Sequence, residues 1–103
     1  MHIVDLALRS AATAGAAVVN GEALADIFWS YAYPADRLEH VRVGVSPEYL
    51  GVVLFLQVRG ANEAEAAARS LCERLIGSVP ALEGWAIVRS RVAQPEDPLN
   101  FGD

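Results

Sequence analysis

Gly51-Val-Val-Leu-Phe-Leu-Gln-Val-Arg-Gly60 is a strongly apolar run, closed at both ends by glycine and uncharged as far as Arg59. Valine, leucine and phenylalanine follow one another there, without the strict alternation of apolar and polar residues found in a strand with one wet face. This composition is typical of a strand that is covered on both faces. We therefore expect a central strand in this run, and the rest of the chain must supply the elements that cover it.

Three other segments have the pattern of strands. They are His2–Arg9, Leu38–Ser46 and Glu83–Val92. In the first two, apolar residues recur at every second position, which is the period of a half-buried strand. Residues 46–51, Ser-Pro-Glu-Tyr-Leu-Gly, have the composition of a turn. They join the second of these segments to the central run, so the two are expected to form an antiparallel hairpin.

Two helices are expected between the strands. The first begins after Asn20, a good N-cap, and ends before Pro34. The second begins after Asn62, with Glu65 three residues later as in a capping box, and ends at Gly77. Each helix has one apolar stripe at helical spacing: Leu24, Ile27, Phe28 and Tyr31 in the first, and Ala64, Ala68, Leu71 and Leu75 in the second.

The order strand, helix, strand, strand, helix, strand is that of the ferredoxin-like plait. In this α+β fold both helices cover one face of a four-stranded antiparallel sheet. We assign residues 1–93 to one such domain and residues 94–103 to a Pro-rich tail, in which Leu99 and Phe101 are expected to dock on a neighbouring surface. One alternative stays open, because residues 3–18 also fit a helix, which would give a helical hairpin on a three-stranded sheet.

The composition excludes several classes of protein. The chain has 103 residues, 53% of them hydrophobic, and its net charge of −5 argues against nucleic acid as a ligand. All eight basic residues are arginine, a usage that favours a bacterial source. The single cysteine, Cys72, allows no internal disulfide, so a cytoplasmic location is expected. The uncharged stretch Ser10–Gly21 is too short to cross a membrane, and Asp5 and Arg9 argue against a signal peptide.

In such a plait the helices leave one face of the sheet without cover. Alternate residues of the central run and of the last strand fall on this face, which gives it an apolar, aromatic centre beside arginine. Exposed patches of this kind mark protein interfaces. We expect a non-enzymatic interface, used by a homodimer or by a bacterial partner protein, at Val53, Phe55, Gln57, Trp85, Ile87 and Arg89.

A small-molecule site, enclosed where the sheet meets its partner, is the alternative. In element order the chain resembles the dimeric α+β barrel monooxygenases and dehydratases, and small amino-acid-sensing domains. The resemblance implies a pocket against the sheet. In that pocket His40 would act as a general base or ligand, and Arg42, Arg89 or Arg91 would hold an anion.

The remaining residues show no catalytic or metal-binding pattern. Two histidines, His2 and His40, and one cysteine provide no ligand spacing for a metal ion. Cys72 lies on the apolar flank of its helix, so a buried structural thiol is expected. We therefore expect neither a catalytic residue nor a cofactor.

Overall fold

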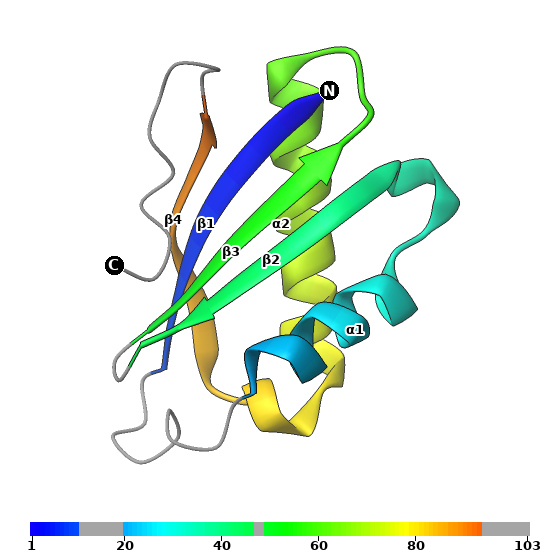
Figure 1. The fold of residues 1–103 in the computed structure, drawn as a ribbon. Helices are drawn as coiled ribbons and strands as arrows, with labels where there is room; N and C mark the ends of the chain where they lie inside the picture. Colours follow the sequence, from blue (N-terminus) through cyan, green and yellow to red (C-terminus); the bar gives the residue numbers. More distant parts are fainter. Residues whose placement is uncertain (11–19, 47–48, 94–103) are drawn as a thin grey trace.

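The computed structural model of this chain describes residues 1–10, 20–46 and 49–93, whose elements are shown in Figure 1. The predicted α+β class, with a four-stranded antiparallel sheet and two α-helices, is confirmed. The tail 94–103, with Leu99 and Phe101, and the stretch 11–19 lie outside the described residues. The elements are β1 (His2–Ser10), α1 (Gly21–Tyr31), the 3-10 turn η2 (Pro34–Asp36), β2 (Leu38–Val45), β3 (Tyr49–Leu56), α2 (Ala61–Ser78), the 3-10 turn η3 (Pro80–Leu82) and β4 (Trp85–Ala93).

The strands are arranged in the order β2-β3-β1-β4, and every neighbouring pair is antiparallel. β1 and β3 are therefore the two central strands. Their pairing runs from His2 opposite Leu56 to Arg9 opposite Tyr49. The alternative in which residues 3–18 form a helix is wrong, because β1 is paired with β3 on one side and with β4 on the other.

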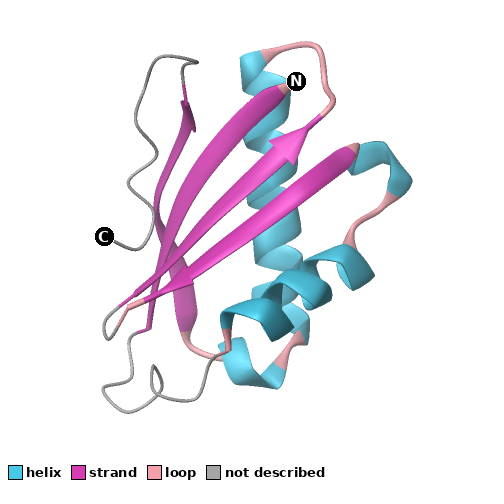
Figure 2. Ribbon diagram, viewed as in Figure 1, coloured by secondary structure: helices cyan, strands magenta, loops and turns pink. Residues whose placement is uncertain are grey.

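Both helices lie on the same face of the sheet (Figure 2). Their apolar stripes meet the strand residues that point toward them, and together they form one core. Burying a side chain of this size contributes about 1.5–3 kcal/mol, so this layer supplies most of the hydrophobic stabilisation. Its largest fully buried members are Phe28, Leu6, Leu8, Leu50, Leu54, Leu56, Leu71, Leu75 and Leu82.

The two helices begin differently. Asn20 caps α1 as predicted, since its Oδ1 accepts a hydrogen bond from the backbone N–H of Ala23 at 3.1 Å. The predicted Asn62 cap of α2 is wrong. Gly60 is already the extended residue before the helix, and its carbonyl accepts the first helical bond from Ala64 at 2.9 Å, which leaves Asn62 exposed in the first turn. Neither α1 nor α2, the α-helices of the described ranges, is long and apolar enough to cross a membrane.

The end of α2 also differs from the prediction. Gly77 was expected to end the helix, but α2 continues to Ser78. Gly77 lies inside the helix and does not have the positive φ of a C-terminal glycine, which among the described glycines only Gly84 adopts, at 86°. The last turn is instead closed by the N–H of Val79, which donates to the carbonyl of Leu75 at 2.8 Å.

β3 starts and ends earlier than its apolar run. Tyr49 belongs to the strand because Ser46 closes the β2–β3 hairpin onto it, with Ser46 N–H donating to the Tyr49 carbonyl at 3.0 Å and Ser46 Oγ donating to the same carbonyl at 2.9 Å. β3 ends at Leu56, and the N–H of Gln57 donates to the carbonyl of Arg37, the residue before β2, at 2.8 Å. The apolar run therefore consists of a strand followed by a connection.

A bulge in β4 changes which of its residues face the helices. Ala7 of β1 lies opposite Arg89, but the next residue, Leu8, lies opposite Ile87, so Val88 has no partner on β1. One extra residue reverses the alternation of side chains along a strand. The prediction that Trp85 and Ile87 lie on the face without helices is therefore wrong: Trp85 is 4% exposed within the core, and Ile87 packs against that core.

Candidate functional site

The face of the sheet opposite the helices is the candidate site, and we call it the open face. No helix or strand of residues 1–10, 20–46 and 49–93 lies over it (Figure 1). The strand pairing arranges its side chains in rows that run across the sheet. The open face consists of Ile3, Asp5, Ala7 and Arg9 of β1, His40, Arg42 and Gly44 of β2, Tyr49, Gly51, Val53 and Phe55 of β3, and Ala86, Arg89, Arg91 and Ala93 of β4.

An acidic residue between arginines occupies the middle of the open face. Asp5 Oδ2 lies 3.8 Å from Arg89 Nη2 and 3.9 Å from Arg91 Nε. The Asp5 side chain is 17% exposed, whereas that of Arg89 is 62% exposed. These distances are too long for direct hydrogen bonds, and ion pairs at such exposure contribute at most about 1 kcal/mol each. The cluster therefore contributes little to the stability of the fold. Its main effect is to place negative and positive charge side by side on the face.

One end of the open face is apolar and aromatic. Phe55 lies opposite Ile3 of β1 and His40 of β2, and Ile3 in turn lies opposite Ala93 of β4. The rings of His40 and Phe55 meet edge to face, with centroids 5.2 Å apart and planes inclined by 63°. Phe55 and Ile3 are half-buried. This row is the part of the face that resembles the aromatic interface centre expected from the sequence.

Val53 lies at the centre of the open face. Its neighbours across the sheet are Asp5 and Arg42, and Gly51 and Phe55 follow the same face along β3. Gly51 adds no side chain, and its own neighbours in the next row are the small residues Ala7 and Gly44. Nevertheless, Val53 is only 2% exposed. The face thus has a row of small residues and, in the next row, a buried valine.

The structure brings together most of the residues that the sequence singled out. Val53, Phe55 and Arg89 share the open face with His40, Arg42 and Arg91, which were selected separately as ligand-binding candidates. Gln57 is exposed but follows the end of β3 and is not part of these rows. Trp85 and Ile87 belong to the opposite face, so the apolar area is smaller than the sequence predicted.

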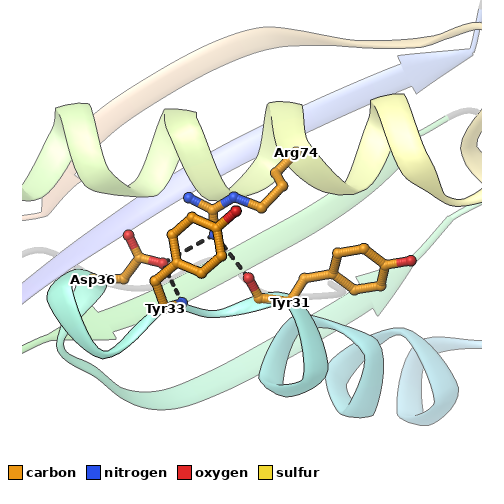
Figure 3. Close-up of polar contacts among 4 residues, drawn as sticks. All are labelled: Tyr31, Tyr33, Asp36 and Arg74. Atoms are coloured by element: carbon orange, nitrogen blue, oxygen red, sulfur yellow. Dashed lines mark hydrogen bonds and ion pairs between the residues drawn. The ribbon is translucent and has the colours of Figure 1, made fainter.

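A second polar cluster was missed by sequence reasoning and is shown in Figure 3. Arg74 Nη1 donates to Asp36 Oδ2 at 3.0 Å and to the carbonyl of Tyr31 at 2.8 Å, while its guanidinium carbon lies 3.8 Å from the centre of the Tyr33 ring. Asp36 Oδ2 also accepts the N–H of Tyr33 at 2.8 Å. These contacts fasten η2 to α2, and no buried side-chain nitrogen or oxygen of the described residues lacks a hydrogen-bond partner. We therefore assign the cluster a structural role.

The sequence signal for this cluster is weak. An aspartate that bonds back to the N–H three residues earlier can be anticipated from Tyr33-Pro-Ala-Asp36, as in a capping box. The pairing with Arg74 crosses 38 residues of sequence and depends on how α2 packs against η2. No local pattern contains that information.

Cys72 is placed as a structural thiol, as the sequence predicted. The Cys72 side chain is fully buried in the core, and this burial, with a smaller contribution from Glu73, raises the pKa of its thiol to about 12, although Arg69 partly opposes the shift. The thiolate that a nucleophile needs is therefore absent near neutral pH. His2 Nδ1 lies 3.1 Å from the Val58 carbonyl. The described part of the chain contains no group of three residues suited to hold a metal ion.

Comparison of the chain with protein-family models, with curated proteins and with solved structures found no match. No family assignment follows from these comparisons. The function is therefore inferred from the geometry and charge of the open face.

Proposed function

We propose that this chain is a ferredoxin-like binding domain, without catalytic activity of its own, that associates with a second copy through the open face. The ferredoxin-like assignment is supported by the element order and by the strand order β2-β3-β1-β4, with both helices on one face. The binding assignment is supported by a face that combines a half-buried aromatic row with paired charges.

The observation that carries this proposal is the environment of Asp5. Its carboxylate is largely buried, yet its ion pairs to Arg89 and Arg91 are 3.8 and 3.9 Å long. A two-fold axis through the middle of the face would set Asp5 of each copy against arginines of the other. Such an interface is self-complementary, as a symmetric dimer requires. It would also bury the Phe55 row of each copy within the dimer interface.

The size of the face predicts how strong the association is. Four strands spaced about 4.8 Å apart, each presenting about eight residues with a rise of about 3.3 Å, cover roughly 500 Å². Two such faces bury roughly 1,000 Å² in total, the lower end of the range for specific interfaces. We therefore expect a weak dimer, with a dissociation constant on the order of micromolar, or about −8 kcal/mol.

The test is sedimentation of the full chain across protein concentrations on both sides of that constant. Phe55→Arg places a charge in the aromatic row and is expected to keep the chain monomeric at every concentration. Ala66→Arg adds the same charge at an exposed site of α2 and is expected to leave the dimer unchanged. Circular dichroism establishes that both variants are folded.

Two results would overturn the proposal. One is a wild-type chain that stays monomeric throughout the concentration range. The other is a Phe55→Arg chain that is folded and dimerises as the wild type does. Should Phe55→Arg fail to fold, Arg89→Glu at the exposed edge of the face serves in its place, with the same expected loss of the dimer.

The ligand-binding alternative has less support from the geometry. Arg42 and Arg91 lie in the same row across the sheet, but Val53 and Asp5 separate them. An anion held between the two arginines would meet the Asp5 carboxylate, and like charges repel. The His40 ring already packs edge to face with the Phe55 ring. The binding-domain proposal therefore accounts for more of the face.

A further inference from the structure

No further inference is drawn: the strongest candidate, the outer face of α1, where Trp29 is 47% exposed and shares a helix face with the exposed Glu22 and Asp26, carries nothing because nothing in the described part of the structure shows what covers it.

Discussion

The two faces of β3 are made of similar residues and have different neighbours. On one side Val52, Leu54 and Leu56 are completely enclosed by α1, α2 and the adjoining strands. On the other side Val53 and Phe55 lie among charged and small residues that no described helix covers. An apolar side chain therefore does not by itself reveal whether it belongs to a core or to a binding surface.

β1 shows the same contrast more sharply. Val4, Leu6 and Leu8 point to the helices and are buried, whereas Asp5 and Arg9 point to the open face. A charge without a partner on the helix side would lose its hydration without compensation, which is why β1 presents Val4, Leu6 and Leu8 to the helices. The open face can carry charges because they keep partners and partial contact with water. The contrast assigns most of the stability to one face and leaves the other as the surface through which we propose that the chain binds.

Truncation on the helix side is expected to have the greatest effect. Leu54→Ala leaves a cavity in the core and should lower the free energy of unfolding by about 2–5 kcal/mol. Phe55→Ala, one residue along on the open face, should cost about 1–2 kcal/mol because Phe55 is only half-buried. Urea denaturation measures both. Equal losses would mean that the open face is a second core and that the contrast between the faces is wrong.

Removing the Asp36 carboxylate tests how much the stability of the fold depends on the pairing of charged groups on the helix side. Asp36→Ala leaves Arg74 and the Tyr33 N–H without their common acceptor, so we expect a loss of about 2–3 kcal/mol in the free energy of unfolding. Asp36→Asn keeps an acceptor and should cost less. The same denaturation experiment compares the two variants. A negligible loss for Asp36→Ala would show that the Tyr31 carbonyl alone is sufficient for Arg74.

Alkaline pH should weaken the core through Cys72. Burial raises the pKa of its thiol from an ordinary value near 9 to about 12, so above pH 9 the unfolded chain releases a proton that the folded chain keeps. The stability present below pH 9 is therefore lost as pH rises toward 12, by up to about 1.4 kcal/mol per pH unit. Denaturation at successive pH values measures the slope.

Cys72→Ala is the control for this pH dependence. It removes the thiol and keeps Tyr31, Tyr33 and Tyr49, whose phenols are present in both proteins. The slope above pH 9 should be reduced in the variant, whatever its stability at neutral pH. An unchanged slope would mean that the buried thiol does not control the alkaline transition.

Neutralising Asp5 should have the smallest effect on stability. Its ion pairs are long and its arginine partners are largely exposed, so Asp5→Asn is expected to change the free energy of unfolding by less than about 1 kcal/mol. The same variant should weaken the proposed dimer clearly, as sedimentation would show. A large loss of stability together with an unchanged dimer would reverse the roles that we assign to the two faces.

Local patterns were sufficient for most of the elements. The two-residue period predicted β1 and β2, and the helical stripes predicted which faces of α1 and α2 pack on the core. Both patterns are local, because a helix or strand on one core repeats its apolar residues with the period of its own backbone. Asn20 was recognisable as a cap because its bond to Ala23 is made within four residues. Asn62 shows the limit of this reasoning, since a good capping residue is not used when the chain enters the helix two residues earlier.

The composition of the open face was decided by tertiary structure. In the sequence, residues 85–92 have no signal for the bulge at Val88, because a bulge is defined by the pairing of β4 with β1. That single residue moved Trp85 into the core and Ile87 against it, and kept Arg89 and Arg91 beside Asp5. The sequence alone determined the elements, since their hydrogen bonds and periods are local. The tertiary structure determined which side chains share a face, because this depends on the pairing register between strands that are distant in sequence.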